Sequence, residues 1–231
     1  MAGKCVYLLP MINASPFIMR KAVAEFGTRL YEQQMIAGTD GNLSVRLGDD
    51  RVLVTPSGLP KGRLAPEDMV IVDMNGKHLQ GSHKASAELA MHLLVYQRRS
   101  EVNAVIHAHP PHATAFAVAG IGLESDVLPE VVVSVGKIPL TDYAGPGTDE
   151  VPKSIEPHVD TCNAFLLRNH GLLTVGRSLD EAYNRHEVVE HYARIVLLAR
   201  HLGNIDAIPG EDFRRLERMR ENLDKTWDPK V

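Results

Sequence analysis

Apolar residues recur at spacings of three and four along the N-terminal part of the chain, from Val23 to Leu30. Such spacing places them on one face of an amphipathic helix. Ser15-Pro16 is typical of a helix start, with serine as the N-cap and proline in the first turn. The pattern therefore predicts a helix that begins near Pro16 and is ended by Gly38.

Shorter apolar stretches bounded by turn residues predict a set of strands. The pair Asn75-Gly76 favours a tight hairpin between two of them. Two of the expected strands lie within the segments 38–46 and 51–58. The others span 69–73, 77–80, 104–109, 131–135, 138–140, 164–168 and 172–175. Most neighbouring strands are joined by short turns, which predicts a largely antiparallel sheet.

Three further helices are expected between and after these strands, over 86–98, over 112–119, and from Ser178 to about residue 202. A polar helix is expected over about 211–223. The pattern predicts an α/β protein of one domain over 1–231, with its core over about 16–202 and a C-terminal helix and tail over 203–231.

Composition narrows the possible functions. The 231 residues are 44% hydrophobic, which suffices for one substantial core, and the net charge of −4 without a long basic run does not point to nucleic acid. The apolar N-terminal stretch is short and is broken by Pro10, so neither a signal peptide nor a membrane span is expected. Cys5 and Cys162 lie too far apart for a disulfide framework, which favours a reducing, cytoplasmic setting.

The first chemical signal is a pair of histidines at the end of an apolar strand, His107 and His109. Residues i and i+2 of a strand point to the same face. Their backbones are then roughly 6–7 Å apart, and two imidazoles at that separation can converge on one metal ion. The pair alone is equally compatible with two hydrogen-bonded histidines that bind no metal.

A third histidine, His170, occupies a polar turn between two apolar stretches and is followed by Gly171. The glycine allows a sharp turn and the close approach of another backbone segment. Three histidine nitrogens with one open position are the ligand set of catalytic zinc sites. A surface histidine in a turn is the alternative interpretation.

Two other segments have plausible structural explanations. Glu88 precedes His92 by four residues on the expected helix, and its local pattern is that of a first-turn glutamate favoured by the helix dipole. His186 and His191 flank two glutamates and superficially resemble a metalloprotease helix, which requires histidines four apart. Their spacing of five indicates an ordinary helix face.

Two turns rich in small and hydroxyl residues, 38–42 and 55–58, could present backbone N–H groups to an anion. Ser86, at the expected start of its helix, could add a hydroxyl and the positive end of the helix dipole. Each turn alone is a weak signal, because most such turns bind nothing.

Taken together, the ordered motifs GTDGNLS, TPSG, SAELAMH, VIHAHPPHATA, DYAGPGT and RNHGLL resemble those of the class II aldolase/adducin-like family. The resemblance runs from about residue 16 to about residue 202. It implies a three-layer α/β sandwich with a central antiparallel sheet, assembled as a homotetramer with sites between neighbouring subunits. It also implies zinc, or another divalent metal such as Mn²⁺ or Co²⁺, held by His107, His109 and His170.

By the same resemblance, Glu88 matches the catalytic glutamate. The residues that match substrate-phosphate positions are Asn42, Ser57, Gly58 and Ser86. Two departures stand out. Ala87 replaces a second serine of the aldolases, and the tyrosine that a neighbouring subunit supplies in the aldolases has no clear counterpart. Glu130 lies near that position, and Tyr143 is a further candidate proton donor.

The expected function is cleavage of a ketose 1-phosphate to dihydroxyacetone phosphate and an aldehyde through a metal-stabilised enediolate. A decarboxylase, a dehydratase or a 4-epimerase of a sugar or sugar-acid phosphate is the alternative on the same scaffold. A non-catalytic adducin-like binding module is a remote alternative, because such a module is expected to lose the zinc ligands.

Overall fold

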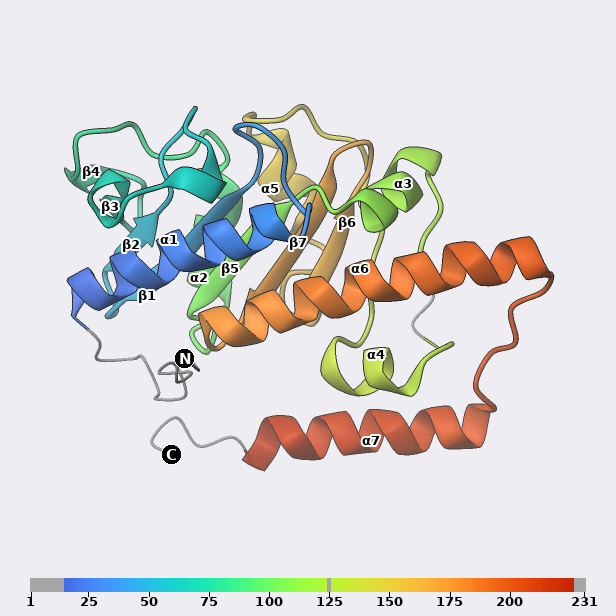
Figure 1. The fold of residues 1–231 in the computed structure, drawn as a ribbon. Coiled ribbons are helices and arrows are strands. Elements are labelled where there is room, and N and C mark those ends of the chain that lie inside the picture. Colours follow the sequence, from blue (N-terminus) through green and yellow to red (C-terminus); the bar gives the residue numbers. More distant parts are fainter. Residues whose placement is uncertain (1–14, 124–125, 227–231) are drawn as a thin grey trace, which may run out of the picture.

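A computed structural model describes residues 15–123 and 126–226 of the chain. Its centre is a seven-stranded sheet in the order β4-β3-β2-β1-β5-β7-β6, in which every pair of neighbours is antiparallel (Figure 1). The predicted α/β class with a mainly antiparallel sheet is confirmed. The expected N-terminal segment before residue 15 lies outside the described residues.

Most strands match the expected apolar stretches to within a few residues. The strands are β1 Asn42–Leu47, β2 Arg51–Val54, β3 Val70–Asp73, β4 His78–Gln80, β5 Ala104–Ala108, β6 Ala164–Leu167 and β7 Gly171–Gly176. Short turns join β1 to β2, β3 to β4, and β6 to β7, and Gly76 has a positive φ of 82° in the second of these. Strand β5 lies between β1 and β7 and so connects the part of the sheet formed by the N-terminal strands to the part formed by the C-terminal strands.

Helices cover both faces of this sheet. On one face α1 (Pro16–Glu32) and α6 (Leu179–Leu202) pack on alternate strand residues, among them Leu43 and Ile106. On the other face α2 (Leu89–Arg98) and α5 (Glu150–Ile155) pack on the intervening residues, among them Val105. The expected three layers are therefore present.

The remaining helices extend the first layer. Helix α3 (Pro111–Ala119) packs on α6 and β7, and α4 (Pro129–Ser134) lies between α6 and α7 (Gly210–Thr226). Short 3-10 turns occupy Lys61–Arg63 and Pro66–Asp68. Among the helices in the described part of the chain, none has the length and apolar character needed to cross a membrane.

Four local expectations need correction. Helix α1 starts at Pro16 with Ser15 as N-cap, as predicted, but it ends at Glu32, well before Gly38. Gln34 has a φ of 59°, a left-handed conformation that ends the helical path. Residues 33–41 then form the loop that leads into β1.

Helix α2 begins at Leu89 instead of near Ser86. Ser86 is extended because its N–H donates to the carbonyl of Thr55, and a backbone bridge joins Pro56 to Ala85. This pairing keeps residues 85–86 beside the 55–58 turn and delays the helix start to the residue after Glu88.

The expected strand 131–135 is wrong, because Pro129–Ser134 is the helix α4. Valine has a high strand propensity, but Pro129 favours a helix start, and packing against α6 and α7 outweighs the propensity. The expected strand 138–140 is reduced to isolated bridges, Leu123 with Ile138 and Leu140 with Leu166.

Candidate metal centre and active-site cleft

The candidate metal centre is built first from β5. Strand alternation buries Ala104, Ile106 and Ala108 against the α1 and α6 layer, so His107 points to the opposite side, where α2 packs. His107 is fully buried and lies directly across from Asn42 of β1. The cross-strand pairing therefore places an amide side chain beside the first histidine.

The turn between β6 and β7 brings the third histidine to the same point. Asn169 adopts a left-handed φ of 56°, and the N–H of His170 donates to the carbonyl of Leu167. At Gly171 an added Cβ would lie 2.6 Å from the carbonyl oxygen of Ala108 and 2.6 Å from Cδ2 of His109. Glycine is thus required for the close approach of this turn to the end of β5.

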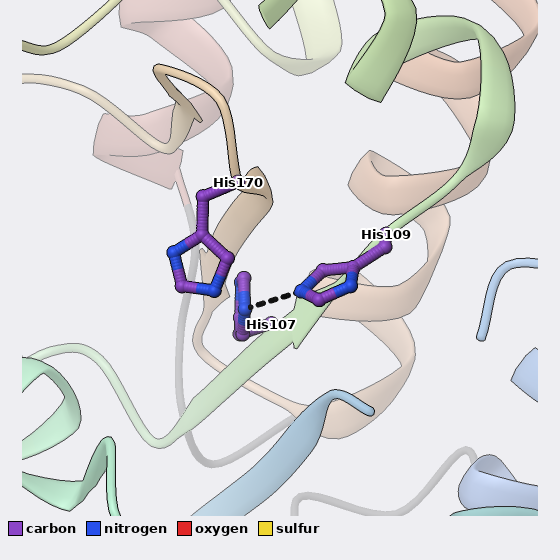
Figure 2. Close-up of side chains that lie close together, drawn as sticks. All are labelled: His107, His109 and His170. Atoms are coloured by element: carbon purple, nitrogen blue, oxygen red, sulfur yellow. Dashed lines mark hydrogen bonds between the residues drawn. The ribbon is translucent and has the colours of Figure 1, made fainter. Parts of the chain in front are cut away.

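The rings of His107, His109 and His170 face one another, with centroids 4.7–5.1 Å apart (Figure 2). Each offers one nitrogen to a set whose members all lie within 4.8 Å of one another. The Nε2 atoms of His107 and His109 are 3.1 Å apart. Tetrahedral ligands at a zinc–nitrogen distance of about 2.0–2.1 Å would be roughly 3.4 Å apart, which is close to the separation of this pair.

A hydrogen bond orients His107, and a carboxylate lies near the Nδ1 atom of His109. The Nδ1 of His107 donates to the carbonyl of Leu172 at 3.0 Å, which leaves Nε2 as its lone-pair nitrogen. The Nδ1 of His109 lies 3.5 Å from the carboxylate of Asp40. Burial, reinforced by the neighbouring histidines, lowers the pKa of His107 well below 6.5, so this ring stays neutral and able to bind a metal.

Glu88 faces these nitrogens from the start of α2. Its Oε1 is 3.2 Å from Nε2 of His170, and its Oε2 is 3.4 Å from Nε2 of His107. Oε2 also accepts a 2.8 Å hydrogen bond from the amide of Asn42. Oε1 is buried and makes no hydrogen bond within the described residues. A buried carboxylate oxygen without a donor, beside three imidazole rings, fits a site for a divalent cation.

The metal centre opens into a cleft of about 480 Å³. The cleft is lined by the segments 39–42, 57–58 and 86–88, by the turn residues 146–147, and by Lys61, His109 and His170. All four residues expected at phosphate positions line it: Asn42, Ser57, Gly58 and Ser86. The structure thus brings the predicted anion-holding residues and most of the predicted metal-site residues to one place.

Local hydrogen bonds hold the two predicted turns together. The hydroxyl of Thr55 accepts from the N–H of Leu43, and the N–H of Ser57 donates to the carbonyl of Lys84. The hydroxyl of Ser86 accepts from the N–H of Glu88 at 3.2 Å. The N–H of Ser57 is therefore not available to an anion, and the turn cannot offer two successive N–H groups. An anion in the cleft would instead contact the side-chain hydroxyls and the Gly58 segment.

Two candidate residues are not brought into this cleft. Tyr143 is 62% exposed and does not line it, although Pro146 and Gly147 of the same segment do. Glu130 is exposed in the first turn of α4. Neither side chain belongs to the group of residues around the three histidines within the described chain.

The metalloprotease-like stretch has a structural role, as expected. His186 is fully buried in α6 and contacts the hydroxyl of Thr174, whereas His191 is exposed. Glu190 accepts hydrogen bonds from the backbone N–H groups of His112 and Ala113 and so caps α3. Within the described chain, neither histidine of this stretch belongs to a group of side chains close enough to hold a metal ion together.

Sequence reasoning missed two residues of the site. His92 is fully buried, with Nε2 2.6 Å from Oδ1 of Asn42 and Nδ1 2.6 Å from the hydroxyl of Ser44. Its position four residues after Glu88 was a visible signal. Lys61 lines the cleft although its side chain is buried, and its loop sequence contains no motif that would have identified it.

Comparison with known proteins agrees with this geometry. The profile of the Class II Aldolase and Adducin N-terminal domain family matches residues 21–197. An L-fuculose phosphate aldolase of Methanococcus maripaludis is 38% identical over 166 residues, covering 72% of this chain and 89% of the relative. A 3-oxo-tetronate 4-phosphate decarboxylase of Haemophilus influenzae is 34% identical over 180 residues, covering 76% of this chain and 85% of the relative.

A solved structure of an L-fuculose 1-phosphate aldolase superposes with a TM-score of 0.81 at 32% identity, covering 89% of this chain and 95% of that one. The expected membership of the class II aldolase/adducin-like family is confirmed, and L-fuculose phosphate aldolases are among the similar proteins. Class II aldolases use a divalent metal, and the matches to aldolases support an enzyme of the carbon–carbon lyase class. The chain belongs to the class II aldolase and adducin family.

Proposed function

We propose that this enzyme cleaves a ketose 1-phosphate, or a related sugar phosphate, to dihydroxyacetone phosphate and an aldehyde. One observation carries the proposal. The carboxylate of Glu88 lies 3.2–3.4 Å from Nε2 atoms of the predicted metal ligands, inside a cleft that also contains two turns suited to a phosphate. A proton-transferring group, a metal site and an anion site are thus within reach of one small molecule.

His107, His109 and His170 would hold the divalent cation. Zinc is our first choice because three neutral imidazoles are typical ligands of catalytic zinc, with Mn²⁺ or Co²⁺ as alternatives. When bound, the cation would polarise the substrate carbonyl and offset negative charge on the oxygens beside it. The hydrogen bond from His107 to Leu172 would hold the His107 ring in the tautomer that leaves Nε2 for the metal.

Glu88 would move the proton at carbon 3. Cleavage removes the proton of the carbon 4 hydroxyl, breaks the bond between carbons 3 and 4, and leaves its electron pair on carbon 3. The released proton, passed on through Tyr143 or water, would protonate the Glu88 carboxylate, which would then transfer it to carbon 3 and complete dihydroxyacetone phosphate. Asn42 orients the carboxylate by donating to Oε2.

The other assigned positions would hold the substrate. Asn42, Ser57, Gly58 and Ser86 would bind the phosphoryl group, since all four line the cleft. Tyr143 remains our candidate proton donor: its phenol would pass a proton on toward Glu88 as it takes up the proton of the carbon 4 hydroxyl. Its exposed position, in the segment that supplies Pro146 and Gly147 to the cleft wall, suits a residue that contacts substrate only after the segment moves or a neighbouring subunit docks.

We further infer a homotetramer with sites between subunits, in the cytoplasm. The tetramer follows from the motif resemblance, and the cytoplasmic setting from two cysteines without disulfide spacing. Gel filtration with light scattering measures the first of these directly.

A decarboxylase of a phosphorylated 3-oxo acid is the second candidate. Ala87 lines the cleft at the position of a serine in the aldolases, so the wall next to Glu88 differs from theirs. The relative from Haemophilus influenzae, at 34% identity, is named as such a decarboxylase. Loss of carbon dioxide also leaves an electron pair on carbon that Glu88 could protonate.

The deciding experiment offers the metal-loaded enzyme a panel of ketose 1-phosphates and of phosphorylated 3-oxo acids. Coupled assays record dihydroxyacetone phosphate and carbon dioxide in parallel. Formation of dihydroxyacetone phosphate from a ketose 1-phosphate supports the aldolase, whereas carbon dioxide from an oxo acid supports the second candidate. If neither product forms from any member of the panel, both assignments are wrong.

A further inference from the structure

The side chain of Lys61 lies between the two turns that line the cleft. It is only 2% exposed, yet it contributes to the cleft wall. Its ammonium Nζ donates to the carbonyl of Thr39 at 2.7 Å and to the carbonyl of Leu59 at 2.8 Å. Thr39 belongs to the first turn and Leu59 directly follows the second, so the ammonium connects the two segments.

These two hydrogen bonds leave the charge of Lys61 without a close counter-ion. No carboxylate of residues 15–123 or 126–226 is within ion-pair distance of Nζ; Asp40 and Glu88 act on it only from farther away. Burial lowers the pKa of Lys61 below 10.5, and those two carboxylates oppose the shift. A buried cation with only carbonyl partners is stabilised when an anion binds beside it.

One part of the cleft wall offers an anion no hydrogen-bond donor. Ser86 is followed by Ala87, whose methyl group cannot donate, and both residues line the cleft with Lys61. A lysine ammonium has three N–H donors, and the carbonyls of Thr39 and Leu59 accept from two of them. Within the described residues the third N–H has no acceptor, so it can donate to an anion in the cleft with the full charge of the ammonium.

We propose that Lys61 is a specificity-determining residue, whose ammonium binds the phosphoryl group of the substrate and selects phosphorylated over unphosphorylated substrates. The inference deepens the proposed function and rests on it for the identity of the anion. A purely structural lysine that only ties the two turns together would leave anion affinity unchanged as long as the fold is intact.

The test measures binding of inorganic phosphate to the metal-free protein by isothermal titration calorimetry, so that turnover plays no part. Lys61→Met keeps the side-chain length and removes the charge, and Lys61→Gln keeps an N–H donor for one carbonyl. The matched control is Lys77→Met, which removes the same charge from an exposed hairpin position. Circular dichroism establishes that each variant is folded.

We expect phosphate to bind roughly 10–100-fold more weakly to both Lys61 variants, the usual range for losing a charge-assisted hydrogen bond. The control should bind as wild type does. Wild-type affinity in a folded Lys61→Gln protein overturns the inference. In turnover assays, the Lys61 variants should raise KM for the phosphorylated substrate far more than they lower kcat.

A second measurement needs no variant. A crystal structure of the wild-type protein with inorganic phosphate should place a phosphate oxygen within hydrogen-bonding distance of Nζ of Lys61. Phosphate bound in the cleft away from Lys61 refutes the inference and leaves the proposed function intact. If the wild-type protein binds no phosphate by either method, a phosphorylated substrate and the role of Lys61 are both refuted.

Discussion

At the scale of single residues, the site depends on a buried hydrogen-bond chain behind Glu88. The amide of Asn42 donates to Glu88, while its carbonyl oxygen is 2.6 Å from Nε2 of His92. The other ring nitrogen is 2.6 Å from the hydroxyl of Ser44, which is 2.8 Å from the hydroxyl of Tyr96. An amide oxygen only accepts, so His92 must carry its proton on Nε2 and accept from Ser44 at Nδ1.

Replacing His92 should therefore disturb Glu88 indirectly. In His92→Phe the oxygen of Asn42 loses its donor, the amide can rotate, and Glu88 loses its orienting hydrogen bond. We expect kcat to fall on the order of 10–100-fold and unfolding to become easier by about 1–3 kcal/mol. Steady-state kinetics and urea unfolding measure the two effects.

The matched control is His186→Phe, since His186 is also fully buried and contacts a threonine hydroxyl, but it does not contact Asn42 or Glu88. It should lose comparable stability and keep most of its turnover. Equal losses of kcat in the two folded variants would show that His92 has only a structural role.

Glu88 itself can be tested by Glu88→Gln. The variant keeps the shape of the side chain and can still contact Asn42, but it cannot carry the transferred proton. We expect kcat to drop by about 10²–10⁴-fold, the usual contribution of a general acid or base. Metal analysis by mass spectrometry should show unchanged metal content, and full turnover at that content would rule out the proton-transfer role.

At the scale of elements, the turn between β6 and β7 controls whether the three histidines meet. Its Asn169 is left-handed, and its Gly171 approaches the end of β5 more closely than any side chain allows. The neighbouring strands are held by regular antiparallel pairing, with His107 opposite Leu173. A small change in the turn should therefore displace His170 without unfolding the sheet.

Gly171→Ala is the direct test of this turn. The added Cβ would lie 2.6 Å from a backbone oxygen, so the turn must move away from β5. We expect at least a tenfold loss of metal affinity, because His170 moves with the turn, together with a loss of stability of roughly 1–3 kcal/mol from overpacking. Competition with a chromophoric chelator measures the affinity.

Gly122→Ala is the matched control, because an added Cβ there meets no atom within 4 Å. It should bind metal as the wild type does. Undiminished metal affinity in Gly171→Ala would mean that the turn is more compliant than its contacts indicate.

At the scale of the whole molecule, the two faces of the sheet differ in the polarity of the side chains that they bury. The α1 and α6 face is mainly apolar, whereas the α2 face buries a polar row in which Asn42, Ser44 and His107 point toward α2. His92 and His186 are buried on opposite faces of the sheet, and burial lowers the pKa of each to about 3.

These two histidines predict acid sensitivity of the whole fold. Below pH 6.5 the unfolded chain binds protons at both positions, while the folded protein stays neutral there until about pH 3. The free energy of unfolding should therefore fall as the pH decreases from 6.5, by roughly 1.4 kcal/mol per pH unit for each histidine. Urea unfolding between pH 4 and pH 6.5 measures the slope.

A His186→Gln variant isolates one contribution. Because glutamine does not titrate, the slope should be smaller than that of the wild type by roughly 1.4 kcal/mol per pH unit. An unchanged slope would contradict the assignment of His186 as a buried neutral group in the folded state.

The sequence by itself was sufficient to determine most of the sheet and the identity of the three histidines. Strand periodicity predicted that His107 and His109 share a face, and the glycine after His170 indicated a tight turn; both are local properties of the backbone. Local pattern was misleading at 131–135, where valine propensity predicted a strand and packing between α6 and α7 produced a helix.

Only the tertiary structure decided which side chains from distant parts of the sequence contact one another. The local pattern of Glu88 was that of a first-turn glutamate, and the fold placed its carboxylate beside His107 and His170. Lys61 gained significance only when its ammonium came to lie between two turns from separate segments. Contacts between residues far apart in the chain depend on how strands and helices pack, which no local spacing encodes. The sequence thus identified the three candidate ligand histidines and most of the strands, and packing determined the groups that surround the histidines.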